Sequence, residues 1–132
     1  MNYWVVGAMW GGKDDVLSEF LTRGYWYCWD VKTTVPDGNA QGNAIAVQQD
    51  RFRGIRPGDR IAVKKMLGQG SSEMSILAIG IVKVVDVEEW RVYVDWMPIG
   101  PMARKVPLRG CTASVHGPFE SSDLWVHQVF HI

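Results

Sequence analysis

The first thirty residues place an apolar run, a glycine-rich loop, an amphipathic stretch and an aromatic-dense segment in immediate succession. The apolar run at 3–8 does not alternate, which predicts a strand buried on both faces. Asp14 and Asp15 are predicted to cap and begin a helix. Gly24 is expected to end that helix, and Tyr25–Trp29 is expected to be extended. Because tryptophan is costly to leave in water and has a flat stacking face, this opening predicts either an unusual core or a pocket for a planar ligand.

The remainder of the chain is rich in strands joined by short turns. Residues 30–43 are polar and contain a Pro-Asp-Gly-Asn turn signature, so a loop is expected there. The elements expected after this loop are a short helix at 44–53, strands at 60–67, 74–85, 90–96 and 108–115, and a helix at 123–130 capped by Ser121 or Ser122. Gly80 is expected to form a bulge or bend. This order predicts an α+β fold, a small, partly closed, mostly antiparallel β-barrel with two or three helices packed on it.

Composition narrows the functional classes. With 132 residues, the chain is expected to form a single domain over 1–132. Its 14 basic and 14 acidic side chains balance, which argues against bulk electrostatic attraction to nucleic acid but leaves room for a local basic face. No apolar run approaches the roughly 20 residues of a membrane span, and the first residues lack the basic start of a signal peptide. A cytoplasmic location without a membrane partner is therefore expected.

Catalytic and metal-binding patterns are missing from the sequence. There is no nucleophile elbow, no P-loop and no Cys–His neighbourhood with an orienting group. Cys28 and Cys111 lack metal-ligand spacing and are interpreted as reduced thiols. His127 and His131 stand four residues apart without a third ligand. The chain is therefore predicted to be neither an enzyme nor a cofactor-binding protein.

Three motifs point to a family. They are WVVGAMWGGKDD followed by an amphipathic helix and GYWYCWD, then IRPGDRIAVK at 55–64, and then MSILAIGIV followed by VYVDW. In their order and spacing, over most of residues 3–96, the chain resembles the EVE domains of the PUA-like superfamily and, more loosely, the YTH domains. The nearest resemblance is to the EVE-like domains at the N-terminus of McrB-type, modification-dependent restriction proteins.

The resemblance implies a function in recognition. Such a domain would bind a modified base of DNA, flipped out of the helix into an aromatic pocket at the mouth of the barrel. Its partners would be a nuclease or an AAA+ motor, in another domain or another chain. Candidate ligands are 5-methylcytosine, 5-hydroxymethylcytosine and N6-methyladenine. The alternative is an RNA-binding module, as in YTH and many PUA-like domains.

Three tryptophans are candidate pocket walls. By resemblance, Trp26 is an aromatic wall, whereas its alternative role is to close the first helix onto the sheet as a core residue. Trp10 lies among glycines and is a candidate second wall or lid, with packing back over the sheet as the alternative. Trp26 and Trp29 are separated by an odd number of residues, so an extended strand points them to opposite faces. The pairing of Trp26 with Trp10 is therefore favoured over the pairing with Trp29.

Two acids are candidates for reading the edge of the base. Asp15 matches an acidic position of some YTH domains, and helix capping is its alternative role. Asp30 is suited to accept a hydrogen bond from an exocyclic amine, or to open the following loop as an Asx turn. The sequence leaves both alternatives open for each residue.

A third set of candidates surrounds the end of the strand at 60–67. Lys64 and Lys65 are predicted to contact phosphates beside the flipped nucleotide, together with a preceding group of arginines, Arg51, Arg53, Arg56 and Arg60. A solvated strand end is the alternative explanation for the two lysines. Ser75 is expected on a strand that borders the pocket.

Overall fold

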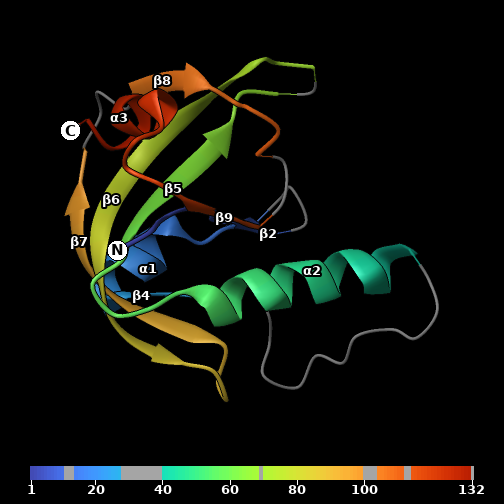
Figure 1. Ribbon diagram of the computed structural model, residues 1–132, viewed down its shortest axis with the longest axis vertical. Coiled ribbons are helices and arrows are strands. Elements are labelled where there is room, and N and C mark those ends of the chain that lie inside the picture. The colour runs from blue at the N-terminus through green and yellow to red at the C-terminus, as the bar shows by residue number, and fades with distance from the viewer. Residues whose placement is uncertain (11–13, 28–39, 69, 100–103, 112–113, 132) are drawn as a thin grey trace.

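A seven-stranded sheet forms the centre of the fold (Figure 1). The computed structural model describes residues 1–10, 14–27, 40–68, 70–99, 104–111 and 114–131. The strands of the sheet are β1 (Tyr3–Gly7), β4 (Tyr25–Trp26), β5 (Arg60–Met66), β6 (Glu73–Asp86), β7 (Arg91–Pro98), β8 (Arg104–Pro107) and β9 (Val115–Phe119). They lie in the order β4-β7-β6-β5-β1-β9, with β8 also paired to β6. A separate hairpin joins β2 (Met9–Trp10) and β3 (Asp14–Asp15), and the helices are α1 (Leu17–Arg23), α2 (Ala40–Gly54) and α3 (Leu124–Phe130).

The structure confirms an α+β fold with a mostly antiparallel sheet and three helices, but the described strands do not close into a barrel. The two-residue strand β4 pairs only with β7, and β9 pairs only with β1. These two strands remain the edges of an open sheet. One pairing is parallel: β1 runs beside β5, with Tyr3 opposite Arg60 and Gly7 opposite Lys64. The predicted strand at the start of the chain is thus confirmed and is placed inside the sheet.

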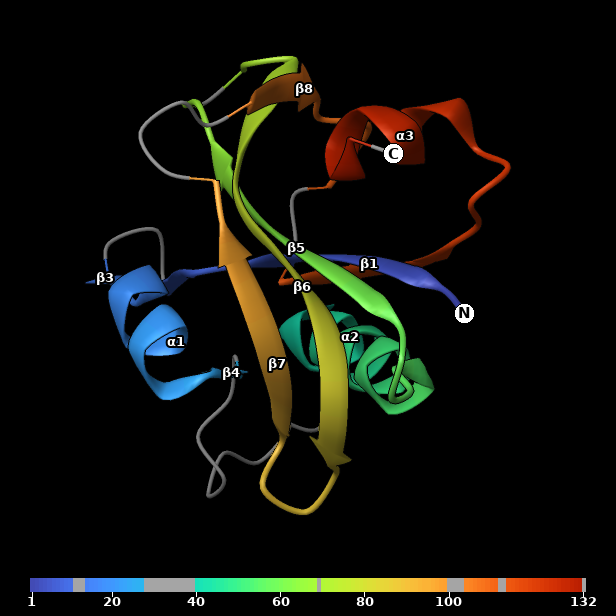
Figure 2. The same cartoon turned by 90° about the vertical axis from the view of Figure 1, so that its left-hand side faces the viewer.

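Alternation along β1 divides the interior into two cores. Trp4 and Val6 belong to one core, whereas Tyr3 and Val5 belong to the other. In Figure 2, β1 crosses the middle of the molecule with α2 below it and α3 above it. The α2 core contains the largest fully buried side chains, Trp4, Phe20, Trp26, Phe52, Ile55 and Ile61. The α3 core contains Met74, Ile76, Val106, Cys111, Trp125 and Phe130.

The start of α1 differs from the prediction. Asp14 and Asp15 form β3 rather than a helix cap, and α1 begins at Leu17 without a side-chain cap. The N–H of Val16 instead donates to the carbonyl of Ala8, at 2.9 Å. The β2–β3 hairpin therefore fixes the chain immediately before the helix. The predicted end of the helix is confirmed, since the residue that follows α1 is the glycine of the expected stop, with a positive φ of 74°.

The strand prediction at 108–115 is wrong, and Gly80 does not form the bulge that was one of its two predicted roles. A continuous strand at 108–115 is prevented by the positive φ angles of Arg109 (49°) and Gly110 (74°), which turn the chain between β8 and β9. At Gly80 no register shift occurs, although shifts lie to either side of it. A Cβ at Gly80 would stand 2.5 Å from Cγ1 of Val94, so this glycine serves close packing of β6 on β7 instead of a bulge.

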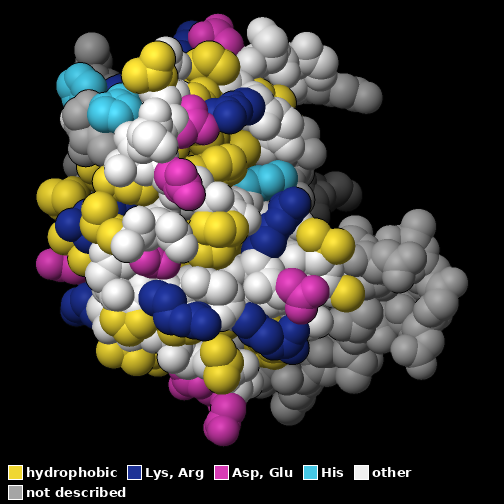
Figure 3. Space-filling model, in the orientation of Figure 1, with side chains coloured by type: hydrophobic (Ala, Val, Ile, Leu, Met, Phe, Trp, Pro, Cys, Tyr) yellow, Lys and Arg dark blue, Asp and Glu magenta, His cyan; other side chains and the backbone are white. Residues whose placement is uncertain are grey.

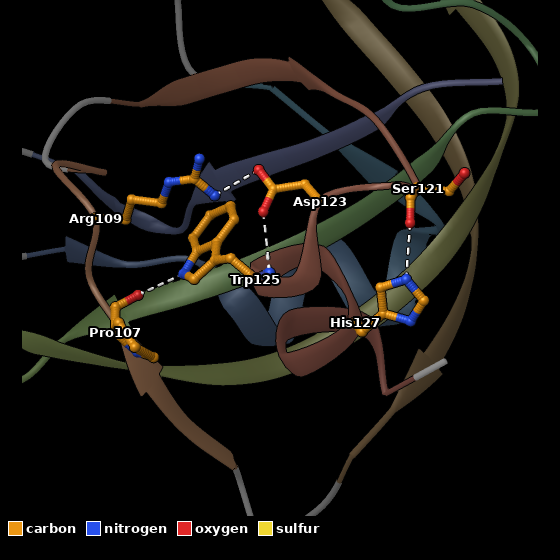
Figure 4. Close-up of polar contacts among 6 residues, drawn as sticks. All are labelled: Pro107, Arg109, Ser121, Asp123, Trp125 and His127. Atoms are coloured by element: carbon orange, nitrogen blue, oxygen red, sulfur yellow. Dashed lines mark hydrogen bonds and ion pairs between the residues drawn. The ribbon is translucent and has the colours of Figure 1, made fainter.

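The C-terminal helix α3 is capped by Asp123, not by Ser121 or Ser122 (Figure 4). The carboxylate of Asp123 accepts a hydrogen bond from the backbone N–H of Trp125 at 3.0 Å and pairs with Arg109. The indole N–H of Trp125 donates to the carbonyl of Pro107 at 2.8 Å. These contacts fix α3 to the end of β8, and they close the α3 core.

Candidate functional site

The indole of Trp26 is fully buried, with 0% of its surface exposed. It lies in the α2 core, where its ring stacks on that of Phe52 with 6.2 Å between centroids and an interplanar angle of 29°. Its N–H donates to the carbonyl of Gly7 at 2.9 Å, at the end of β1. In this arrangement Trp26 has the geometry of a core residue. A base would reach its face only after neighbouring groups had moved.

The other aromatic and acidic candidates are placed only in part. The backbones of Trp10 and Asp15 lie in the β2–β3 hairpin, in which Trp10 pairs with Asp14 and Met9 pairs with Asp15. This hairpin begins two residues after the end of β1. The remaining two candidates, Trp29 and Asp30, lie outside the described residues.

The two candidate lysines have opposite environments. Lys64 is buried, with 6% of its surface exposed, whereas its neighbour Lys65 is exposed. The Nζ of Lys64 is 3.6 Å from the position that a Cβ would take at Gly7. Lys65 lies directly opposite Ser75 of β6, which is buried. The same role was predicted for both lysines, but their environments in the structure differ.

Gly7 is the point at which the candidates meet. The indole N–H of Trp26 reaches its carbonyl, and the ammonium group of Lys64 lies over its Cα. The hairpin that carries Trp10 and Asp15 starts two residues further along the chain. The C-terminal end of β1 therefore gathers four of the predicted site residues from three separate parts of the sequence.

Two of the arginines grouped with these lysines, Arg53 and Arg60, lie in other surroundings. Arg60 begins β5 and Lys64 lies near its end, so strand geometry separates their Cα atoms by about 13 Å. Arg53 pairs with Asp50 at 3.2 Å and lies 5.0 Å above the ring of Trp90. Figure 3 shows basic side chains interspersed with acidic ones across the visible face. The described charges thus form no single basic surface on that face.

Two residues near Lys64, Cys111 and His116, were not predicted as site residues, whereas Arg51 belongs to the predicted group of arginines. An Nη1 atom of Arg51 donates to the carbonyl of Val115 at 3.0 Å and lies 3.2 Å from Nδ1 of His116. Burial, followed by the charges of Arg51 and Lys64, lowers the pKa of His116 from 6.5 to about 4. Burial raises the pKa of the Cys111 thiol, and the charge of Lys64 partly offsets this effect. No local motif signals this group, because the pairing of β5 with β1 and of β1 with β9 brings His116 near Lys64, and Arg51 joins them from α2.

A second cluster, also not predicted, lies at the β4 edge. The guanidinium of Arg91 is 5.0 Å from the ring centroid of Tyr25 and 5.2 Å from that of Tyr27. The two tyrosine rings meet edge to face at 5.4 Å. Burial, with a smaller contribution from Glu19, raises the pKa of both phenols. This arrangement stabilises the short edge strand through cation–π and aromatic contacts.

Compared with protein-family models and with curated proteins, the chain matches none of them. The resemblance to EVE domains therefore rests on the sequence motifs alone. Within the described part of the chain, no group of three or more His, Cys, Asp or Glu side chains is arranged to hold a metal ion. Among the same residues, no helix is both long enough and apolar enough to span a membrane.

Proposed function

We propose that this protein is a non-catalytic reader domain that binds a modified base of DNA, flipped out of the duplex, beside the C-terminal end of β1. The finer fold assignment, a PUA-like or EVE-like domain, is part of the proposal. So are its cytoplasmic location and its association with a nuclease or AAA+ motor of a modification-dependent restriction system. Base flipping removes the need for a wide basic surface, because much of the recognition occurs in one pocket.

The observation that carries the proposal is the convergence at Gly7. Trp26 and Lys64 approach this residue from β4 and β5, and the β2–β3 hairpin with Trp10 and Asp15 follows it directly. An aromatic face, a cation and a short hairpin in one place are the parts that a flipped nucleotide requires. Stacking on an aromatic face contributes roughly 1–3 kcal/mol per base, which offsets part of the unstacking cost.

The burial of Trp26 adds a condition to the proposal. Because its indole is fully covered, a base stacks on it only after the surrounding groups have moved. Binding would therefore be coupled to a conformational change, which slows association relative to a preformed pocket. Stopped-flow association with a modified duplex would show this as a rate that reaches a plateau with increasing DNA concentration.

The direct test compares matched oligonucleotides. The protein is titrated with duplexes that carry one 5-methylcytosine, 5-hydroxymethylcytosine or N6-methyladenine, with the unmodified duplex, and with the corresponding RNA strands. The proposal expects one modified duplex to bind more tightly than its unmodified control. Preferential binding of RNA would replace DNA by RNA as the ligand, and equal binding of all duplexes would refute the reader function.

A pair of tryptophan variants separates recognition from stability. Trp26 and Trp125 are both buried, and each donates its indole N–H to a backbone carbonyl, but they lie in different cores. Trp26→Phe is expected to abolish discrimination of the modified base while the domain still unfolds cooperatively. Trp125→Phe is the matched control and is expected to retain discrimination. Equal losses in both variants would identify a general effect of stability and count against a role for Trp26 in binding.

A further inference from the structure

Lys64 is a buried cation without a compensating anion among the described residues. Only 6% of its surface is exposed, and its ammonium group has no hydrogen bond or ion pair with any residue that the structure describes. A buried charge is costly unless it is paired, and burial accordingly lowers the pKa of this lysine. A strand that needed only structural stability would carry an apolar residue at this position.

The groups around Lys64 do not neutralise its charge. Arg51 and Lys64 both lie close enough to His116 to lower its pKa. The same two cations also act to lower the pKa of the Cys111 thiol. Among the described residues, no Asp or Glu figures among the charged groups that perturb the pKa of Lys64, Cys111 or His116. Two cations, a neutral imidazole and a thiol thus share one region of the sheet beside β9. In the described part of the chain, this region has a net positive charge and no anion.

The ammonium group of Lys64 lies beside the backbone of Gly7. In register, Lys64 lies opposite Gly7 of β1, and the N–H of Gly7 donates to the carbonyl of Ser114 at 2.9 Å. Because Gly7 has no side chain, Nζ of Lys64 extends over β1 towards β9. Arg51 uses only Nη1 for its described contacts, so its Nη2 and Nε are not engaged by described residues. Arg51, from α2, and Lys64, from β5, therefore both approach His116 with donors that no described residue engages.

We propose that Lys64, assisted by Arg51, binds an oxyanion of the phosphate class over Gly7. A tetrahedral anion accepts hydrogen bonds from an ammonium and a guanidinium group at once, and it supplies the missing negative charge. The inference does not depend on recognition of a modified base. The anion has two chemical sources, free inorganic phosphate and the phosphodiester of a bound nucleic acid, which share the same recognition chemistry.

The test uses inorganic phosphate and two adjacent lysines. Thermal unfolding of the full chain is followed in increasing phosphate, with sodium chloride at matched ionic strength as reference. The wild type is expected to show a saturable rise in Tm that chloride does not produce. Lys64→Met should weaken phosphate binding at least about tenfold, because a charge-assisted hydrogen bond is lost. Lys65→Met is the matched control, which removes the same charge from an exposed position and should leave the response unchanged.

Three outcomes of this comparison would overturn the proposal. A wild type without a saturable response overturns the proposal, and so does an unchanged response in Lys64→Met. Loss of the response in Lys65→Met but not in Lys64→Met places the anion at the exposed strand end, which also overturns it. Arg51→Met is expected to weaken binding without abolishing it.

A second measurement does not depend on any variant. The ring protons of His116 are titrated by NMR with and without phosphate, starting from a pKa of about 4. An anion bound beside Arg51 and Lys64 should raise this pKa, because it offsets the two cations that lower it. An unchanged pKa at a phosphate concentration that raises Tm would place the anion elsewhere and refute the proposal.

Competition then identifies the source of the anion. Displacement of phosphate by a short unmodified single strand, monitored through the same His116 signals, assigns the site to a nucleic-acid phosphodiester. Persistence of bound phosphate at a saturating concentration of the strand assigns it to the free anion. The site stands in both cases, and neither case requires a modified base, so failure of the reader function and failure of the anion site remain distinguishable.

Discussion

The two ends of β5 each bury a charged side chain, and they do so in opposite ways. Asp59, immediately before the strand, is 3% exposed and accepts hydrogen bonds from three separate N–H groups. These donors are the backbone of Asn2, the indole of Trp4 and the backbone of Arg56, each at 2.9 Å. Lys64, near the other end, is almost as deeply buried and has no such partner among the described residues.

Asp59 is therefore a charge with a structural role, whereas Lys64 is the charge for which we propose a bound anion. Asp59 joins the start of the chain to the turn before β5. Its carboxylate and the N–H groups that donate to it are thus satisfied within the fold. The charge of Lys64 is left uncompensated by the part of the chain that the structure describes. One strand thus shows a closed polar network at one end and an incomplete one at the other. Four measurements test this contrast, from the largest expected effect to the smallest.

Asp59→Ala should produce the largest loss of stability. It leaves the N–H groups of Asn2, Trp4 and Arg56 without their acceptor, and each unsatisfied buried donor costs about 1–3 kcal/mol. A decrease of about 3 kcal/mol or more in the free energy of unfolding is expected in urea titrations. Asp59→Asn retains one acceptor oxygen and should lose less. A decrease below about 1 kcal/mol in Asp59→Ala would show that the network is not structural.

Acidification should weaken the fold through the region around Lys64. The pKa of His116 is about 4 in the folded protein and about 6.5 when unfolded, so the unfolded chain binds the extra proton first. Stability is therefore complete above pH 6.5 and is lost as the pH falls from 6.5 to 4. The loss is about 2 kcal/mol once solvent screening of this half-buried ring is included. His116→Gln should flatten the dependence, and a wild-type curve without a slope in this window would contradict the account.

Lys64→Met should stabilise the protein in the absence of phosphate. Replacing a buried, unpaired charge by an apolar side chain of similar length removes a desolvation cost of about 1 kcal/mol or more. The sign is opposite to that of Asp59→Ala, which makes the pair a direct test of the contrast. Lys65→Met, on the exposed neighbour, should change the free energy of unfolding by less than about 0.5 kcal/mol. Destabilisation of Lys64→Met would show that the ammonium group has a structural partner.

Gly7→Ala should have the smallest effect on stability. The new Cβ would meet Nζ of Lys64 at 3.6 Å, an ordinary contact, and the change in the free energy of unfolding should stay within about 0.5 kcal/mol. The methyl group nevertheless occupies the space where the anion is proposed to bind. Phosphate affinity should therefore fall although stability does not. A variant that binds phosphate as well as the wild type would move the anion away from β1.

The extent to which sequence predicts this fold depends on how local each signal is. The strands around Val63, Ala78 and Val94 follow from apolar patterning and short turns, and they occur close to the expected positions. The start of α1 was mispredicted because a hairpin partner, not an aspartate, satisfies the N–H of Val16. The strand expected at 108–115 is divided because Arg109 adopts a left-handed conformation that residue type does not signal.

The candidate site shows the same limit. Trp26 and Lys64 could be selected from motifs, and in the structure both lie beside Gly7. Their roles in binding stay predictions. Cys111 and His116 could not be selected, because each is unremarkable in its own segment, and Arg51 was selected only as one of four arginines. The order β5-β1-β9 brings His116 near Lys64, and Arg51 reaches His116 from α2. Nonlocal sheet register therefore supplies the information that composition and spacing do not contain.

The position of β1 in the sheet has a consequence for folding during synthesis. This first strand lies between β5 and β9, and its last strand partner, Phe119, lies near the other end of the sequence. During synthesis, the apolar segment Tyr3–Gly7 leaves the ribosome long before either partner exists. The sheet around β1 is thus completed only after Phe119 has been made, and until then this apolar strand is exposed to aggregation unless other segments cover it.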